Sequence, residues 1–453
     1  MAENFVEVDR DTPMLLPADL RDWVPEDDLV HFILEAVKGL DRTQWVVNER
    51  GSGRAQYPPL MMLALLIYCY ANGIFSSRRI ERATYRDLGV RFLTGDTHPD
   101  HDTICAFRRQ NQRLISRCFV QILELAQELK LLQVGTISVD GTRLEANASK
   151  HRGVSYQRSG ELIEQLELEV KELLRRAEAA DNQSETDLQQ LPKEIGQRQA
   201  LATKLQAARQ QIEARHREQF AAEQGEFEKR QADYEQRKGR GIKPSPPKDR
   251  GPDPNAQANL TDPDSRIMRK TKNEAFAQAY NAQLAVDAEG SQLILGTGIS
   301  QNSADNNQLQ PMLERVEDTL GQSPTAILAD HGYVNGEVIA QIEARGIESF
   351  IALRAEAAER RRYDLRQTEQ RRENPRPFKA PVLVAMEEKL RRPEGRQRYL
   401  RRQASVEPVI GIIKRVLGFN QFLLRGLQKV SLEWELVCLA YNFKRLHKMV
   451  QTA

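Results

Sequence analysis

The spacing of apolar residues changes from helical to strand-like along the chain. From about residue 17 to residue 133 the spacing is helical throughout, and its clearest segment is the apolar run from Tyr57 to Gly73, with prolines near its start and a glycine at its end. From Val134 the segment TISVDGT alternates small β-formers before a glycine, as a buried strand does where it reaches a sheet edge. We therefore expect a helical N-terminal domain over residues 1–133, followed by a strand.

Residues 157–238 form a charged segment that is poor in glycine. Its apolar residues recur every three or four positions, as at Leu162 and Leu166 and again at Leu201 and Leu205, and the polar stretch DNQSETDLQQLP separates the two series. This pattern predicts an antiparallel helical hairpin. A self-packing spacer is the plain interpretation of the hairpin, and a contact between two copies of the chain is the alternative. The Pro-, Gly- and Lys-rich stretch that follows is typical of an extended or flexible linker.

A strand pattern returns after the linker. AQAYNAQLAVD and QLILGTGIS flank the turn DAEGS and predict a β-hairpin in which Gly290 takes the positive φ. We then expect a helix over 306–320, the strand TAILAD, a helix over 335–345, the strand SFIAL, and, after a basic stretch, helices at EPVIGIIKRVLG and SLEWELVCLAYNFKRLHKMV. This order predicts an α/β protein with a ribonuclease H-like mixed sheet. The core would comprise residues 134–150 and 259–453, interrupted by the hairpin and linker at 151–258 and by a basic insertion at 354–402.

Composition adds limits to this picture. The 453 residues are 40% hydrophobic and 29% charged, which is enough for stable cores, but the net charge of +2 gives no general attraction to nucleic acid. Any contact with DNA must come from local clusters of Lys and Arg. The four cysteines lie far apart without a CxxC pair, so we expect reduced core residues. An acidic N-terminus and the lack of a long apolar run argue against export and membrane spanning, and predict a cytoplasmic protein.

Three acids hold equivalent places in the predicted fold. Asp140 is expected to end the first strand, Asp330 to end the fourth, and Glu407 to start the last core helix. Carboxylates that converge at strand ends supply the hard oxygen ligands that Mg²⁺ prefers, and two such ions about 3.5 to 4 Å apart can support phosphoryl transfer. Any one of these acids could equally be a structural cap.

Lys414 follows Glu407 by seven residues, so the two are expected on one helix face. A carboxylate on a metal ion and an ammonium on a neighbouring DNA phosphate would suit that spacing. The alternative is an ordinary amphipathic helix with one exposed pair.

Several blocks of the sequence resemble a known family. ISVDGTRLEANASKH, DPDSRIMRKTKNEAFAQAYNAQLAVD, SADNNQLQPML, ILADHGY and VEPVIGIIKRVLGFNQFLLRGLQKVSLEWELVCLAYNFKRL together resemble the DDE transposases of bacterial insertion sequences. YPPLMMLALLIYCYANGIFSSRRIE and HPDHDTICAFRR resemble the helical domain that precedes their catalytic core. The resemblance implies that Asp140, Asp330 and Glu407 form the catalytic triad, holding two Mg²⁺ ions that Mn²⁺ could replace.

The same resemblance implies the reaction and the partners. Such enzymes cleave DNA at the ends of the element and transfer the strand into target DNA. The partners would be double-stranded DNA, as terminal inverted repeats and as target, and the active complex would be at least a dimer because two ends must meet. The protein would be associated with the nucleoid when it is bound to DNA. An inactive DNA-binding remnant, or a related nuclease without strand transfer, are the alternatives.

A common signature of these enzymes is Tyr, two residues, Arg, three residues, Glu, six residues, Lys. Glu407 and Lys414 keep the last spacing, whereas four residues separate Arg402 from Glu407. By the resemblance we expect Tyr399 and Arg402 to contact the DNA end, together with Arg398, which lies beside them in the basic stretch.

A second candidate DNA contact lies in the N-terminal domain. CAFRRQNQRLISR is expected on one helix, with Arg108, Arg109 and Arg113 near one another and Asn and Gln between them. These side chains can read purine edges in a major groove, although a solvated basic face is an equal alternative. His98 and His101 stand among acids at the expected helix start, where we expect helix capping rather than metal binding. His331, beside Asp330, is expected to have a structural role.

Overall fold

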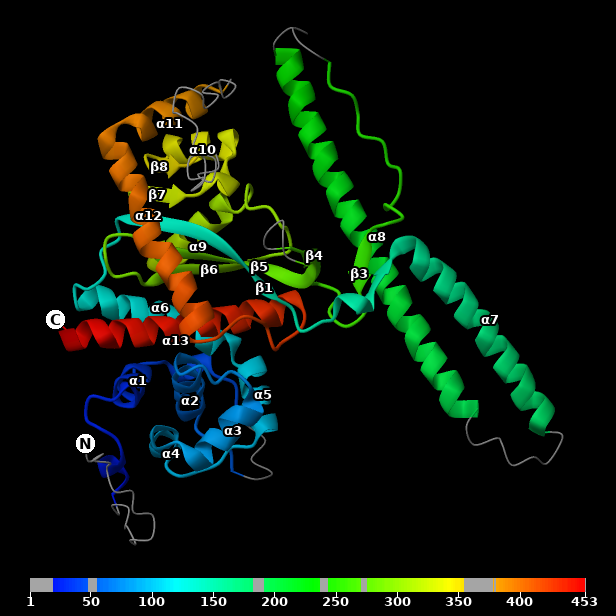
Figure 1. Cartoon of the computed structure of the whole chain (residues 1–453), viewed down its shortest axis with the longest axis horizontal. Coiled ribbons are helices and arrows are strands. Elements are labelled where there is room, and N and C mark those ends of the chain that lie inside the picture. The colour runs from blue at the N-terminus through cyan, green and yellow to red at the C-terminus, as the bar shows by residue number, and fades with distance from the viewer. Residues whose placement is uncertain are drawn as a thin grey trace, which may run out of the picture.

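The computed structural model describes residues 19–47, 55–181, 191–236, 243–269, 275–353, 378 and 380–452. Figure 1 shows a group of N-terminal helices, a central sheet covered by helices, and a long two-helix arm that projects from the side of the sheet. Within these residues no helix is long and apolar enough to cross a membrane. All four cysteines are free; Cys69, Cys118 and Cys438 are buried, as predicted for core residues, whereas Cys105 is partly exposed.

The N-terminal part is helical, as predicted. Its helices are α1 (Leu29–Val37), α2 (Pro59–Ala71), α3 (Ser77–Arg86), α4 (Leu88–Thr94), α5 (His101–Gln110) and α6 (Gln112–Glu128), with short 3₁₀ turns at Leu20–Trp23 and Arg42–Gln44. Helix α2 begins at a proline. The first N–H groups of a helix have no partner within the helix, so the missing N–H of proline costs no hydrogen bond there. The helix ends before Gly73, which has φ 73°. Every residue of α2 from Met62 onwards is buried, so this helix forms the centre of the N-terminal packing.

The single helix expected for CAFRRQNQRLISR is wrong, because it is broken at Asn111 between α5 and α6. The side chain of Asn111 accepts a hydrogen bond from the backbone N–H of Val46 at 2.8 Å and donates to the carbonyl of Phe107 at 3.1 Å. An amide that binds local backbone in this way competes with the helical ladder.

The sheet confirms the ribonuclease H-like fold. Its main strands are β1 (Thr136–Glu145), β5 (Ala277–Asp287), β6 (Ile294–Ser300), β7 (Ala326–Ala329) and β8 (Glu348–Ile351). Strand β1 is central, antiparallel to β5 on one side and parallel to β7 on the other, while β6 pairs with β5 and β8 with β7. The short strand β4 (Arg266–Met268) pairs with the start of β5. Helices α9 (Leu309–Leu320) and α10 (Gly336–Ala344) connect the later strands.

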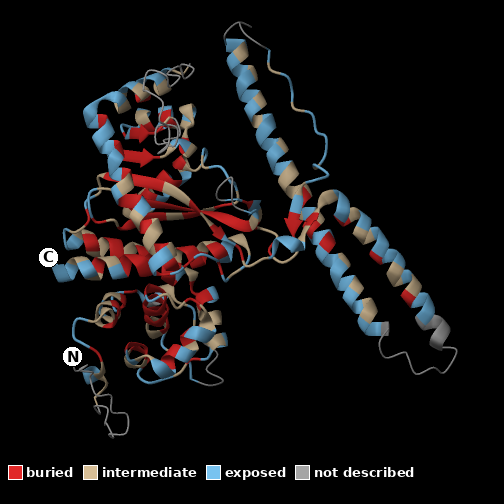
Figure 2. Ribbon diagram, in the orientation of Figure 1, coloured by how far each residue is buried: buried red, intermediate tan, exposed pale blue. Residues whose placement is uncertain are grey.

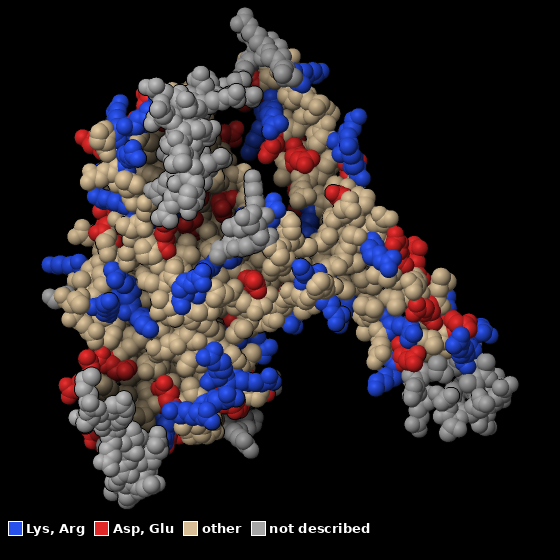
Figure 3. Space-filling view, in the orientation of Figure 1, with Lys and Arg blue, Asp and Glu red and all other residues tan. Residues whose placement is uncertain are grey.

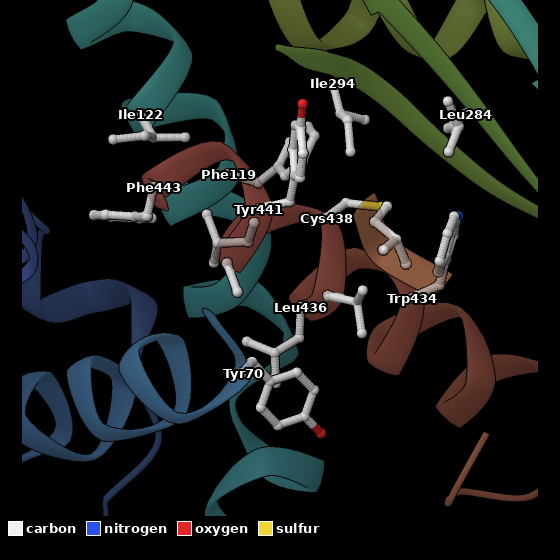
Figure 4. Packing of buried hydrophobic residues seen from close by; sticks show 14 of the residues in the cluster. Tyr70, Phe119, Ile122, Leu284, Ile294, Trp434, Leu436, Cys438, Tyr441 and Phe443 are labelled. Atoms are coloured by element: carbon white, nitrogen blue, oxygen red, sulfur yellow. The ribbon is translucent and has the colours of Figure 1, made fainter. Parts of the chain in front are cut away.

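Helix α13 (Leu427–Thr452) joins the sheet to the N-terminal helices in one hydrophobic core. Figure 4 shows Trp434 and Cys438 of α13 beside Leu284 and Ile294 of the sheet, with Tyr70 and Phe119 of the N-terminal helices close by. The indole N–H of Trp434 donates to the carbonyl of Gln283 at 2.9 Å, so its one polar atom is satisfied while the ring is buried.

The arm confirms the predicted antiparallel hairpin. It consists of α7 (Tyr156–Asp181) and α8 (Leu191–Gln236), and at its root β2 (Gly153–Ser155) pairs with β3 (Gln257–Asn259). Tyr156 donates a hydrogen bond to Glu213, and Arg198 binds Glu169, so the helices run in opposite directions. Buried residues such as Leu166 and Leu205 lie where the two helices pack on each other and on the strands at the root, and most other residues of the arm are exposed or partly exposed (Figure 2). The polar stretch expected as a turn falls largely outside the described residues.

The last part of the chain differs from the prediction in one boundary. Helix α11 (Pro381–Arg391) is followed by α12 (Pro393–Gly411) and by a π-helical turn at Ile412–Val416. Glu407 therefore lies near the end of a long helix rather than at the start of a short one, and the expected limit of the basic insertion at residue 402 falls inside α12. Residues 354–377 of that insertion lie outside the described residues. The proposed division into domains stays a prediction.

Candidate active site

The first two acids meet where strands β1 and β7 separate. The parallel ladder between these strands ends at the pair Ser138 and Leu328, whereas the antiparallel ladder to β5 continues through Asp140. Asp140 thus stands in the middle of β1, not at its end as expected, but it stands at the point where its parallel neighbour stops. Asp330 follows β7 directly and caps the next turn by accepting a hydrogen bond from the N–H of Gly332 at 2.8 Å.

Asp140 is in an environment that opposes its negative charge. Its side chain is only 18% exposed, and burial raises its pKa to about 7, with further increases from Asp330 and Asp305 that Arg402 partly offsets. Arg402 alone does not supply enough positive charge to balance the buried carboxylate of Asp140 and the acids beside it. A bound cation would provide that charge.

Arg402 links the first acid to the third. One guanidinium nitrogen lies 3.1 Å from Oδ2 of Asp140 and the other lies 2.8 Å from Oε1 of Glu407. Arg402 is 8% exposed, whereas Glu407 is 49% exposed. The extra residue between Arg402 and Glu407 does not separate them, because the long arginine side chain spans the difference along α12.

A fourth acid, Asp305, belongs to the same neighbourhood. Its Oδ1 accepts hydrogen bonds from Asn281 and Gln283 of β5, each at 2.7 Å, and the hydroxyl of Tyr333 donates to Gln283 in turn. Asp305 is not among the acids expected from the sequence, because it does not follow a strand directly. The available signal was the pair of amide side chains at alternate positions of a strand that is buried along nearly all of its length.

Gly141, next to Asp140, allows this network to approach β1. A Cβ atom at this position would lie 2.3 Å from Nε2 of Gln283 and 2.8 Å from Oδ1 of Asp305, which is closer than atoms can pack. The Asp-Gly pair therefore combines a charged residue with room for the polar side chains of β5.

The donor set suits a divalent cation, although the part of the chain that the structure describes contains no ready-made cluster of three or more ligands of the Asp, Glu, His or Cys type. Asp140 and Asp330 offer hard carboxylate oxygens, and Asp140 is short of positive charge. The carboxylate of Glu407 is held by Arg402.

The other residues expected beside the acids, Lys414, Arg398 and Tyr399, lie in three different environments. Lys414 lies in the π-helical turn and donates to the carbonyl of Arg143 on β1 at 3.0 Å, so it is close to the strand that carries Asp140. Arg398 is paired with Glu348 on β8. Tyr399 is only 7% exposed and packs in a small apolar cluster under α12, so little of its side chain is available to DNA, and its expected contact with DNA stays a prediction.

The N-terminal arginines also separate into two kinds. Arg108 is 3% exposed, donates to the hydroxyl of Tyr70 at 2.6 Å and lies 3.9 Å from Glu433. It is a core residue, and its expected contact with DNA, which this burial opposes, stays a prediction. Arg109 and Arg113 are exposed on either side of the break between α5 and α6.

Helix α3 adds an exposed basic face that the sequence analysis missed. Figure 3 shows Lys and Arg side chains gathered over α3 and α5. The exposed arginines of α3 are Arg78, Arg79, Arg82 and Arg86. The helical spacing of these arginines in SRRIERATYR could have predicted this basic face.

The histidines near α5 have structural contacts. His98 is 3.1 Å from the hydroxyl of Thr84 and stacks on Tyr85, and His101 is 2.8 Å from Glu81. Asp100 accepts a hydrogen bond from the N–H of Thr103 at 2.7 Å, which confirms the predicted helix cap.

Two family models match the sequence. A transposase domain (DUF772) matches residues 18–110, and a transposase DDE domain matches residues 255–443, which include Asp330 and Glu407 but not Asp140. Comparisons with curated proteins and with solved structures gave no match. The two matched domains stand in the order of the insertion-sequence enzymes, and the second spans most of a ribonuclease H-like sheet, so this chain belongs to the DDE transposases of bacterial insertion sequences.

Proposed function

We propose that this transposase cleaves DNA at the ends of its insertion sequence and joins the freed ends to target DNA, with Asp140, Asp330 and Glu407 as its catalytic acids. The contact of Arg402 with both Asp140 and Glu407 is the observation that carries this proposal. It joins an acid of the central strand to an acid of the last core helix, next to the turn that Asp330 caps.

The three carboxylates would hold two Mg²⁺ ions, which Mn²⁺ could replace. Ions bound in this way supply an activated water or 3′-hydroxyl and stabilise the leaving oxygen of an in-line displacement. Members of this family typically use divalent metals. The high pKa of Asp140 supports the proposal, because it marks a buried acid that needs a nearby positive charge.

Other residues of this chain would prepare the site. Arg402 holds Asp140 and Glu407 with one planar fork, which keeps two like charges in place before DNA arrives. Lys414 donates to the carbonyl of Arg143, which places its ammonium group beside β1, where it would bind a DNA phosphate. Asp305 fixes Asn281 and Gln283 next to Gly141.

Double-stranded DNA would contact two surfaces. The exposed arginines of α3, together with Arg109 and Arg113, form a basic face on the N-terminal helices, suited to the terminal inverted repeats. The acids and Lys414 would meet the cleaved end and the target. Since two ends must be joined in one reaction, the active complex would be a dimer or larger.

The test uses a duplex that carries an element end, taken from the DNA that flanks the gene, and a supercoiled target plasmid. With Mg²⁺ or Mn²⁺ we expect nicked ends and joined products, both lost in Asp140→Asn, Asp330→Asn and Glu407→Gln. Asp318→Asn, the same change at an exposed position of α9, is the matched control and should retain activity.

Each alternative function predicts a different result. Nicking without joined products would identify a nuclease that lacks strand transfer. Binding of the ends without any metal-dependent cutting would identify an inactive remnant. Unchanged cleavage by Asp140→Asn would overturn the assignment of the acids.

A further inference from the structure

A separate pocket of about 370 Å³ lies at the root of the arm. Helix α8 contributes Arg215, β4 contributes Arg266, and β5 contributes Gln278, while the segment that carries β3 contributes Asn255. Figure 1 shows β3 and β4 at the place where the arm meets the sheet. None of the acids discussed above lines this pocket.

Both arginines are held by neutral partners. Arg215 donates to the carbonyls of Gln257 at 2.9 Å and Gln211 at 3.2 Å. Arg266 donates to the carbonyls of Pro263 and Ser265 at 2.9 and 2.8 Å. Within the described residues neither guanidinium forms an ion pair with a carboxylate. Their forks are thus fixed in position while their charges are not neutralised by direct contact.

Arg215 lies in a positive environment, whereas Arg266 lies in a mixed one. Burial lowers the pKa of Arg215 to about 10, and the charge of Arg266 lowers it further, against a smaller opposing effect of Asp264. Burial also lowers the pKa of Arg266, but Asp264, Tyr280 and Asp262 oppose that decrease. Arg215 is therefore the less compensated of the two charges, and an anion bound by both guanidinium groups would stabilise it.

We propose that this pocket binds a backbone phosphate of double-stranded DNA during transposition, an inference that rests on the proposed function. Arginine forks match the geometry of a phosphate, and the amide groups of Asn255 and Gln278 offer further hydrogen bonds to it. No base-reading role is needed, so the contact would be independent of sequence.

The pocket lies further along the sheet than the acids. Arg266 pairs with Ala279 on β5, and Asp140 pairs with Leu284, five residues further along the same strand. At roughly 3.3 Å per residue the two places are about 17 Å apart along the strand, and the odd spacing puts the two side chains on opposite faces of the sheet. This separation is about half of the roughly 34 Å that one turn of duplex DNA spans, so a duplex would reach both places only by passing around the end of the sheet.

The test measures how the full-length protein binds a labelled duplex that carries an element end, over a series of salt concentrations. We expect Arg215→Gln and Arg266→Gln each to weaken binding by about tenfold and to reduce the salt slope by about one, as the loss of one phosphate contact does. Arg217→Gln is the matched control: it removes the same charge from an exposed position on α8, and should leave the slope unchanged. Arg215→Lys, which keeps the charge, should retain most of the slope if the root of the arm stays folded, as circular dichroism would show.

Several results would overturn the proposal. Wild-type affinity and slope in both folded Gln variants would do so, whether or not the enzyme cleaves. If inorganic phosphate stabilises the wild type against heat but not Arg215→Gln, while duplex binding is the same in both, the pocket takes a free anion and not DNA. If the proposed function is wrong and the pocket proposal is right, the result is different: the wild type binds the duplex through this pocket, but Asp140→Asn cuts as well as the wild type.

Discussion

A guanidinium nitrogen of Arg402 lies 3.1 Å from a carboxylate oxygen of Asp140, although 262 positions separate the two residues in the chain. This contact couples the central strand to α12, and the same arginine reaches Glu407. A positive side chain thus stands among acids that are expected to hold metal ions. Its removal should affect both the folded chain and the reaction.

We expect Arg402→Ala to lower the free energy of unfolding of the metal-free protein by roughly 2 kcal/mol, because it leaves the buried Asp140 without its nearest positive charge. Cleavage should fall at the same time. Arg402→Lys keeps one charge but not the fork that spans both acids, so it should recover part of the stability and little activity. Urea unfolding and cleavage of an element-end duplex measure the two effects.

Arg398→Ala on the same helix is the control for that prediction. Its partner Glu348 is exposed, and an exposed ion pair contributes only about 0 to 1 kcal/mol. Equal losses of stability in the Arg402 and Arg398 variants would contradict a special role for Arg402.

The pH dependence of stability should report the state of Asp140. Its pKa is raised to about 7 in the folded chain, above its ordinary value near 4 in the unfolded chain. The folded state therefore binds a proton that the unfolded state has lost, and the stabilising effect of that proton disappears as the pH rises from about 4 to about 7. Metal binding requires the ionised carboxylate, so metal affinity should increase over the same range.

Asp140→Asn tests this prediction without metal. The variant should gain stability relative to the wild type as the pH rises: the difference between their free energies of unfolding, variant minus wild type, should be larger by at least about 1 kcal/mol at pH 8 than at pH 5, since each unit of pKa shift corresponds to about 1.4 kcal/mol. Asp318→Asn, at an exposed position, should show no such difference. A pH-independent gap between wild type and Asp140→Asn would show that Asp140 titrates normally.

Gly141→Ala should damage both the fold and the reaction. The new methyl group would lie 2.3 Å from the side-chain amide of Gln283 and 2.8 Å from the carboxylate of Asp305, so these side chains would have to move and lose their hydrogen bond, at a cost of about 1 to 3 kcal/mol. The move would disturb the polar network beside Asp140, so cleavage should fall by at least about tenfold even in folded protein.

Gly196→Ala in α8 is the matched control for that change. Nothing lies within 4 Å of a Cβ atom at this position, so the substitution should stabilise the protein by about 0.5 to 1 kcal/mol. Thermal unfolding of both variants measures the difference. A Gly141→Ala protein as stable and as active as the wild type would exclude the crowding.

The sequence predicted the strands and helices of the core well, because each has a clear apolar period. It predicted less well the features that depend on contacts between distant segments. The break at Asn111 depends on a hydrogen bond to Val46, and Asp305 is brought to the acids by amides of β5. Local spacing does not record such partners.

Local spacing also could not separate buried arginines from exposed ones. Arg108 and Arg109 are neighbours in a basic helix and cannot be told apart by composition. Only the packing of α5 on Tyr70 and Glu433 separates a buried residue from an exposed one. Likewise Tyr399 keeps its family spacing to Arg402, though not to Glu407, yet its side chain packs between α12 and the sheet.

Arg108 and Arg109 should therefore respond in opposite ways to the same substitution. Arg108→Gln leaves the buried Glu433 without its positive neighbour, and breaking such a pair from one side costs about 3 to 5 kcal/mol. Arg109→Gln removes an exposed charge and should change stability by less than about 0.5 kcal/mol. It should instead weaken binding of an element-end duplex and reduce the salt slope by about one, as loss of a phosphate contact does. Thermal unfolding and duplex titration on both variants would separate them, and a stable Arg108→Gln protein with weak DNA binding would reverse the assignment.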